Sequence, residues 1–307
     1  MRILKPTIEN LEEAARAIRA GELVGMPTET VYGLAADATN LSAVIKTFEA
    51  KNRPPDNPLI VHIAHLRQID PLVTRFSDDA QLLAERFWPG PLTLILPKSG
   101  EVLDEVTGGK ATVAVRIPSH PVALRLIDLA GVPVSAPSAN LFMALSPTRA
   151  NHLDPVLGDR LNMILDGGAC EIGLESTVLD LSRDRPTVLR PGGVSRAEIE
   201  SVLGRAVGGS GSDERLSPGM YPRHYAPKTP VRLVEELHLG DAGITFLDAW
   251  PNQIQLPNNP REYAVSLYAA LHRLDAEGHS EILIESPPHD AAWEAVWDRL
   301  RKLSTPG

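Results

Sequence analysis

The proline-rich loop at residues 51–58 (Lys-Asn-Arg-Pro-Pro-Asp-Asn-Pro) constrains this chain more than any other feature, because three of its eight residues are proline. Proline fixes φ and biases the preceding residue towards extended conformations, so a stiff loop is predicted. The loop presents Lys51, Arg53 and Asn57 from one short span, and His62 follows on an apolar strand. Two cations and an amide held this way suit an oligophosphate, whose charge requires preorganised donors. A solvated connection with incidental basic residues fits this segment equally well, so the rest of the chain must decide.

Length and composition narrow the class of protein. The chain has 307 residues, 43% of them hydrophobic, and a formal net charge of −9. This length favours two domains, and the acidic balance argues against a protein that coats nucleic acid by bulk charge. The single cysteine, Cys170, excludes an internal disulfide and favours a reducing compartment. Without a signal-like N-terminus or a membrane-spanning apolar run, we expect a cytoplasmic protein with no membrane partner.

The sequence predicts a large first domain, a linker and a small second domain. Residues 1–206 mix helices and strands without strict βαβ alternation, which favours an α/β (α+β) domain with a mixed sheet. Residues 207–228 begin as a Gly/Ser-rich linker but also carry aromatic and basic residues, so we expect this linker to contact another part of the molecule. Strands alternate with helices over residues 229–307, which indicates a small three-layer α/β unit.

Helix signals in the sequence predict where Lys51 and Arg53 lie. Thr7, Asn40 and Ser77 are predicted N-caps of three helices. The second of these helices delivers Lys51 and Arg53 at its C-terminal end. Cations at that position also stabilise the helix dipole, which is a structural alternative to a role in ligand binding.

Several widespread chemistries lack their sequence motifs. The chain contains no Walker A motif, G-x-G-x-x-G fingerprint, His-Glu-x-x-His or Cys-x-x-Cys pair, or G-x-S-x-G elbow. Polar turns nevertheless recur at predicted strand ends in the first domain, and their cations indicate an anionic ligand, a phosphate or a carboxylate. The residues of these turns are Thr30, Lys51, Arg53, Asn57, His62, Thr112, Arg116, Ser138, Asn140, Ser176 and Arg190.

The order of these motifs over roughly residues 5 to 230 resembles the YrdC-type threonylcarbamoyl-AMP synthases, in their larger two-domain form. The resemblance is carried by residues 27–34 (PTETVYGL), 51–54 (KNRP), 57–62 (NPLIVH), 88–93 (WPGPLT), 113–116 (VAVR), 136–140 (APSAN), 189–192 (LRPG), 217–220 (SPGM) and 224–227 (HYAP).

The resemblance implies a twisted sheet around a large concave basic cavity, with a Rossmann-like C-terminal domain. It implies a nucleotidyltransferase that condenses L-threonine, bicarbonate or CO₂, and ATP into threonylcarbamoyl-AMP and pyrophosphate. The product would serve threonylcarbamoyladenosine formation in tRNA by a separate transferase, with which transient contact is expected, together with weak RNA binding. Mg²⁺ would accompany ATP, held mainly by its phosphates, and no protein residue is assigned as a metal ligand or as a general base.

Carried over by motif, one set of residues would bind threonine: Thr30, His62, Arg116 and Ser176. A second set would bind ATP: Arg53, Asn57, Thr112, Ser138, Asn140, Ser146, Arg190 and, from the linker, Tyr225. Lys51 and Arg53 would stabilise charge on the phosphates, and Arg116 would pair with the threonine carboxylate.

Two departures and two alternatives accompany this interpretation. Residues 141–145 (LFMAL) are more apolar than the family pattern, and the C-terminal domain is short for the two-domain form. One alternative is a YrdC-type module that binds double-stranded RNA, and the other is a carbamoyl-transfer domain of the hydrogenase-maturation type. The aromatic linker disfavours the first, and the absence of a longer, cysteine-rich chain disfavours the second.

Overall fold

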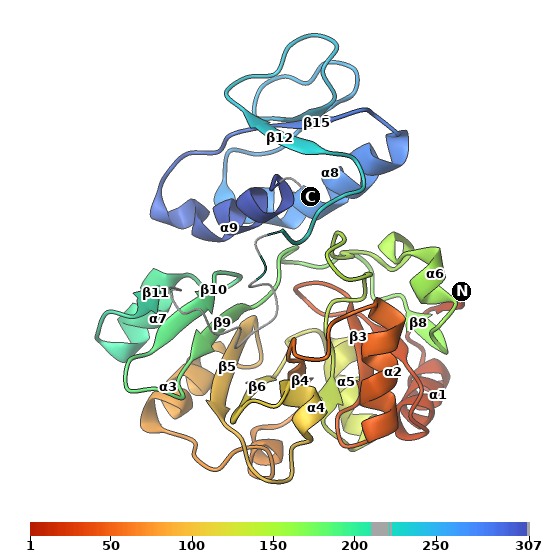
Figure 1. Ribbon diagram of the computed structural model, residues 1–307, viewed down its shortest axis with the longest axis vertical. Helices are drawn as coiled ribbons and strands as arrows, with labels where there is room; N and C mark the ends of the chain where they lie inside the picture. Colours follow the sequence, from red (N-terminus) through yellow and green to blue (C-terminus); the bar gives the residue numbers. More distant parts are fainter. Residues whose placement is uncertain (210–220, 222, 306–307) are drawn as a thin grey trace.

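The computed structural model describes residues 1–209, 221 and 223–305, which form two α/β domains joined by the linker (Figure 1). Within these residues the first domain contains an eleven-stranded sheet in the order β1-β8-β2-β3-β7-β4-β6-β5-β9-β10-β11. Parallel and antiparallel neighbours alternate irregularly along it, which confirms the predicted mixed sheet. The strands are β1 (Ile3–Leu4), β2 (Val24–Met26), β3 (Gly33–Asp37), β4 (Ile60–His62), β5 (Leu92–Pro97), β6 (Thr112–Arg116), β7 (Val134–Ser135), β8 (Met163–Leu165), β9 (Thr177–Asp180), β10 (Thr187–Arg190) and β11 (Gly208–Gly209).

Helices pack on this sheet in groups, each with its own apolar cluster. α1 and α5 share one cluster, and α3 and α7 contribute to another. The predicted caps are confirmed: the side chains of Thr7, Asn40 and Ser77 accept backbone N–H bonds at the starts of α1, α2 and α3. The elements are α1 (Ile8–Arg19), α2 (Leu41–Lys51), α3 (Asp78–Phe87), α4 (Asp104–Thr107), α5 (Pro121–Ala130), α6 (Pro155–Gly158), α7 (Arg196–Leu203), and the 3-10 turns η1 (Leu66–Ile69) and η2 (Ala150–His152).

The pairing of β4 with β6 positions the polar residues of the first domain. The two strands run parallel, with His62 opposite Arg116. β5 pairs with β6 on the other side and then with β9, which begins directly after Ser176. Residues far apart in the sequence therefore meet at the ends of neighbouring strands in the middle of the sheet.

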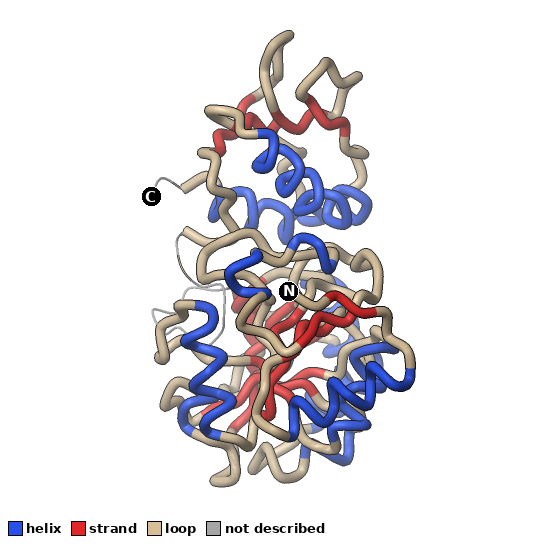
Figure 2. Tube along the Cα trace, turned by 90° about the vertical axis from the view of Figure 1, so that its right-hand side faces the viewer, coloured by secondary structure: helices blue, strands red, loops and turns tan. Residues whose placement is uncertain are grey.

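The second domain is a four-stranded parallel sheet in the order β12-β15-β13-β14, covered by two helices. Both helices lie between this sheet and the first domain, and loops lie on the other side (Figures 1 and 2). The predicted three-layer unit is therefore wrong for the described residues, because the connections 235–242 and 246–252 contain no helix. The elements are β12 (Val231–Val234), β13 (Gly243–Thr245), β14 (Gln253–Gln255), α8 (Pro260–Glu277), β15 (Ile282–Glu285), η3 (Ala291–Trp293) and α9 (Glu294–Leu303).

The two domains share an apolar core. Val31, Leu145 and Leu174 of the first domain pack into the same cluster as the buried faces of α8 and α9. Trp293 and Trp297 are both buried in this cluster, so their rings belong to the core. Across the described residues, none of the helices combines the length and the apolar character needed to span a membrane.

The linker begins as part of the first sheet. Gly208 and Gly209 form β11, which pairs in parallel with β10, so the ordered sheet extends into the segment assigned to the linker. The motif at residues 217–220 lies outside the described residues.

Candidate active site

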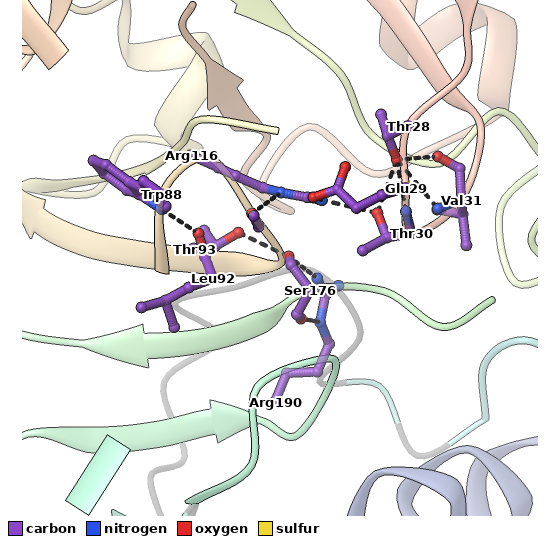
Figure 3. Close-up of polar contacts among 11 residues, drawn as sticks. Thr28, Glu29, Thr30, Val31, Trp88, Leu92, Thr93, Arg116, Ser176 and Arg190 are labelled. Atoms are coloured by element: carbon purple, nitrogen blue, oxygen red, sulfur yellow. Dashed lines mark hydrogen bonds and ion pairs between the residues drawn. The ribbon is translucent and has the colours of Figure 1, made fainter. Parts of the chain in front are cut away.

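Arg116 ends β6 with its guanidinium buried among polar partners (Figure 3). Its Nη2 donates to Glu29 Oε1 at 2.6 Å, its Nη1 to the Thr30 hydroxyl at 3.0 Å, and its Nε to the Gly90 carbonyl at 3.1 Å. Arginine carries five N–H donors, so these bonds within the described chain leave one N–H on each terminal nitrogen for a further acceptor. This geometry suits a carboxylate that approaches the fork end-on.

His62 lies beside Arg116 as its register partner. Its Nδ1 is 3.2 Å from the carbonyl oxygen of Ile60. Burial, together with the charge of Arg116, lowers the pKa of His62 to about 3, so the ring is neutral at pH 7. A neutral imidazole adds a hydrogen-bonding group here without a second positive charge.

Arg190, at the end of β10, fixes the segment that carries Ser176. Its Nε donates to the Ser176 carbonyl at 3.1 Å and its Nη2 to the Ser176 hydroxyl at 3.2 Å, while that hydroxyl lies 2.8 Å from the hydroxyl of Thr93 (Figure 3). Gly192 permits this close approach, because a Cβ there would lie 2.3 Å from the Glu175 carbonyl oxygen. Any side chain at position 192 would push the two loops apart.

Arg53 holds the proline-rich loop in shape. Its Nη2 donates to Asn57 Oδ1 at 2.6 Å and to the Pro58 carbonyl at 2.8 Å, and its Nε donates to the Asn57 carbonyl at 3.2 Å. Within the loop, Asn52 caps α2 in a left-handed conformation (φ +53°). Burial lowers the pKa of Arg53 to about 10, which still leaves the guanidinium charged at pH 7.

Lys51 contacts the backbone of a neighbouring turn. Its buried ammonium donates to the carbonyls of Ser138 and Asn140, both at 2.5 Å. Asn140 Nδ2 in turn donates to two carbonyls of segment 141–145. Burial, with a further contribution from Arg53, lowers the pKa of Lys51 well below its ordinary value. In this structure Lys51 therefore orders the turn that carries Ser138.

The described end of the linker lies over these groups. His224 and Tyr225 are buried, and Tyr225 adopts a left-handed conformation (φ +60°) that is unusual for a bulky residue. The Ala226 N–H donates to the Met143 carbonyl at 2.9 Å. The Phe142 ring packs edge-on against His224, with centroids 6.0 Å apart. The apolar segment 141–145 is therefore the surface against which the described end of the linker packs.

A cavity of about 40 Å³ remains beneath the linker. It is far smaller than the roughly 300–1,000 Å³ of typical ligand pockets, so a nucleotide can enter only if linker residues move. The residues that line it are Thr30, Val31, Arg53, Ile60, His62, Arg116, Ala136, Pro137, Ser138, Glu175, Ser176, Arg190, His224 and Tyr225.

The remaining candidate residues lie behind or beside this lining. Lys51, Asn57 and Asn140 contact lining residues as described above, and the Ser146 hydroxyl donates to Glu175 Oε1 at 2.5 Å. Thr112 is half-buried at the start of β6, at the opposite end of that strand from Arg116. The structure thus brings together all the predicted residues except Thr112.

Three charged or polar residues of the site were not singled out from the sequence. Glu29 pairs with Arg116, Glu175 lines the cavity, and His224 lies beside Tyr225. Each directly precedes a predicted residue in the sequence (Thr30, Ser176 and Tyr225), and this adjacency was the signal that could have found it. Burial alone would raise the pKa of Glu29, but the charge and hydrogen bond of Arg116 outweigh it and lower that pKa.

Several buried polar atoms at the site have no hydrogen-bond partner among the described residues. They include Asn57 Nδ2, Asn140 Oδ1, His224 Nδ1 and the Tyr225 hydroxyl. Buried polar groups are nearly always paired, so their concentration here marks a place where a polar ligand would complete the bonding.

The described chain offers little support for a metal site formed by protein ligands. Its histidine, cysteine, aspartate and glutamate side chains form no group of three or more that could hold an ion. Glu29 and Glu175, the carboxylates at the site, are both engaged by arginines.

Fold and site together define an α/β protein with a buried cationic cavity closed by an interdomain linker. A family model described as "Telomere recombination" matches residues 16–192, and a model of the threonylcarbamoyl-AMP synthase C-terminal domain matches residues 194–304. The chain therefore belongs to the Sua5/YrdC family, with both domains of its threonylcarbamoyl-AMP synthases.

Full-length relatives agree with this membership. The threonylcarbamoyl-AMP synthase of Pyrococcus abyssi is 43% identical, with 99% of this chain and 98% of that protein covered. The Bacillus subtilis enzyme of the same name is 41% identical, with 96% and 92% covered. The crystal structure of P. abyssi Sua5 complexed with L-threonine is similar with a TM-score of 0.90 and 40% identity, with 99% of this chain and 96% of that chain covered.

Proposed function

We propose that this protein is an L-threonylcarbamoyladenylate synthase, which condenses L-threonine, bicarbonate or CO₂, and ATP into threonylcarbamoyl-AMP and pyrophosphate. The observation that carries this proposal is the buried cavity into which Arg53, Arg116 and Arg190 converge beneath Tyr225. Three cations in one enclosed place suit a substrate pair with a carboxylate and a triphosphate.

Threonine would bind around Arg116. The N–H groups that remain on its terminal nitrogens would donate to the α-carboxylate, while Glu29 keeps the guanidinium in position. Thr30, Ser176 and neutral His62 would surround the amine and the side-chain hydroxyl. Because Thr30 and Ser176 are already tied to Arg116 and Arg190, this pocket is preorganised.

ATP would bind on the side of the proline-rich loop. Arg53 and Arg190 would face the phosphates, with Ser138 and Tyr225 at the cavity wall. Asn57 and Asn140 each carry a buried unpaired atom that a nucleotide could satisfy. Lys51 would act through the turn at Ser138, and Ser146 would act through Glu175. Thr112 lies at the opposite end of β6 from Arg116, so it would contact only the part of ATP that is farthest from Arg116.

The chemistry would proceed in two steps. The neutral threonine amine adds to CO₂ to form an N-carboxylate, and its proton passes to solvent. A carbamate oxygen then attacks the α-phosphorus of ATP, and the bond to the β-phosphate oxygen breaks to release pyrophosphate. Mg²⁺ bound to the phosphates would supply charge neutralisation, while Arg53 and Arg190 stabilise the charge that develops on them.

Residues 1–206 would carry the chemistry. The linker, residues 207–228, would move away to admit substrates and then return to exclude water from the labile carbamate. Residues 229–307 would support the linker. This role fits the small closed cavity and its lining by His224 and Tyr225. The product would then pass to a tRNA-modifying transferase by transient contact in the cytoplasm. Since the cations are buried, the site offers an RNA duplex little direct contact.

A pyrophosphate-release assay with single omissions tests the proposal. Purified protein with ATP and Mg²⁺ should release pyrophosphate only when both threonine and bicarbonate are present. Release that continues without threonine, or no release with the complete mixture, would contradict it. Salt-sensitive binding of double-stranded RNA without pyrophosphate release would instead favour the RNA-binding alternative.

A further inference from the structure

Arg299 on α9 is a buried arginine of the C-terminal domain, and the site as assigned above does not include it. Its side chain is 0% exposed, which is rare for an arginine and requires that its charge be compensated. The guanidinium points out of its own domain towards the loops that carry Glu175 and Pro191.

The contacts of Arg299 join three segments of the molecule. Its Nε donates to Glu175 Oε2 at 2.8 Å, and its Nη1 donates to the Pro191 carbonyl at 3.0 Å. Its Cζ lies 4.9 Å from the centroid of the Tyr225 ring, in a cation–π contact. The same guanidinium therefore touches the cavity wall, the Arg190 loop and the linker residue above the cavity.

Glu175 extends this connection into the site. Its Oε1 accepts the Ser146 hydroxyl at 2.5 Å, and its Oε2 also accepts the Tyr268 hydroxyl at 3.3 Å. Burial would raise the pKa of Glu175, but Arg299 and Arg190 outweigh it and lower that pKa, so the carboxylate stays charged. The next residue, Ser176, is the one that Arg190 holds.

We propose that Arg299 is a positioning residue through which the C-terminal domain sets the closed form of the active site. It orients Glu175 beside Ser176 and supports the Tyr225 ring over the cavity. This inference rests on the proposed synthase function. It gives the C-terminal domain a specific role in ATP binding, because without Arg299 the Tyr225 ring and Glu175 lose the partner that holds them at the cavity wall, and ATP is held less well once it has entered.

The test compares Arg299→Met, which keeps an unbranched side chain but removes the guanidinium and its charge, with Arg299→Lys and with Arg301→Met. Arg301 is an exposed arginine of the same helix, stacked on Trp297, and is a matched control. Two readouts are taken: amide hydrogen exchange of residues 223–229, and KM for ATP against kcat in pyrophosphate release.

Arg299→Met should raise KM for ATP about tenfold and speed exchange of residues 223–229 to a similar degree, with exchange in α1 and α5 unchanged. Arg299→Lys should recover part of both effects, and Arg301→Met should match the wild type. A folded Arg299→Met protein with both values within about twofold of the wild type would overturn the proposal.

A double-mutant comparison separates positioning from general stability. If Arg299 acts partly by supporting Tyr225, adding Arg299→Met to Tyr225→Ala should weaken ATP binding by less than Arg299→Met does in the wild type. Additive losses would contradict the proposal, as would faster exchange throughout the protein. If Arg299→Met does not fold, Arg299→Lys decides by the same readouts. If the wild type releases no pyrophosphate, the proposed function is wrong. The exchange experiment still tests whether Arg299 holds residues 223–229 in place.

Discussion

At the scale of single residues, the site depends on arginines that are shared between the protein and a ligand. Arg116 is fixed by Glu29, Thr30 and Gly90, and it still has donors for one more acceptor. Its position could be predicted from the alternation in β6. Its pairing with Glu29 could not, because 87 residues separate the two and only the order of strands in the sheet, β2-β3-β7-β4-β6, brings the turn between β2 and β3 to the end of β6.

Replacement of Arg116 by Ala should weaken threonine binding far more than ATP binding. Removal of one partner of a buried charged pair costs about 2–5 kcal/mol, so a loss of about a hundredfold for threonine is expected. Isothermal titration with each substrate alone measures this, with the exposed Arg125→Ala as the control. Equal losses for threonine and ATP would contradict the assignment of Arg116.

Stability should fall in mild acid because buried His62 and half-buried His152 are held neutral. Burial lowers the pKa of His62 to about 3 and of His152 to about 4, from an ordinary value of 6.5. Below pH 6.5 the unfolded chain binds protons that the folded chain does not, so the free energy of unfolding falls as pH falls towards these values. Each histidine contributes at most about 1.4 kcal/mol per pH unit.

Urea unfolding between pH 7 and pH 4.5 measures this slope. His62→Gln should make it shallower, because the variant lacks one of the protons that distinguish the two states. An unchanged slope in a folded His62→Gln protein would show that His62 is not held neutral by the fold.

At the scale of elements, the helices and their caps could be predicted, because their signals are local. Thr7, Asn40 and Ser77 each act within three residues of their own position. The absence of a second helical layer in the second domain could not be predicted, because it depends on two connections, 235–242 and 246–252, that contain no helix. The apolar segment 141–145 stood out as a departure from the family pattern, and the structure gives it a physical reason, because it lies against the linker.

Phe142→Ala should loosen the linker with little effect on the fold. Phe142 packs edge-on against Tyr221 and His224, and each such contact contributes about 1 kcal/mol. We expect KM for ATP to rise several-fold in the pyrophosphate assay. Phe76→Ala, a partly buried control that packs against the core of the first domain, should instead lower thermal stability and leave KM for ATP unchanged. The reverse pattern would refute the role of segment 141–145.

At the scale of the whole molecule, the second domain completes a core and a site that begin in the first. The pairing of Arg299 with Glu175 spans 124 residues, and no local pattern could predict it. The first domain nevertheless has apolar clusters of its own, built on α1, α3, α5 and the sheet.

Deletion of residues 210–307 should therefore leave a folded first domain that has lost most of its synthase activity. The deletion keeps β11 but removes Tyr225 from the cavity lining, together with Arg299, which contacts Tyr225. Circular dichroism checks the fold, and pyrophosphate release checks the activity. Full activity in a folded truncation would exclude the proposed role of the linker and of the second domain.

Mass spectrometry of the product with ¹³C-labelled bicarbonate tests the central claim most directly. Purified protein given ATP, Mg²⁺, threonine and the labelled bicarbonate should form threonylcarbamoyl-AMP that carries a single ¹³C atom, together with an equal amount of pyrophosphate. Arg116→Ala should form far less of it at the same threonine concentration. If pyrophosphate appears with no labelled adenylate, or if neither product forms, the cavity beneath Tyr225 does not perform this reaction.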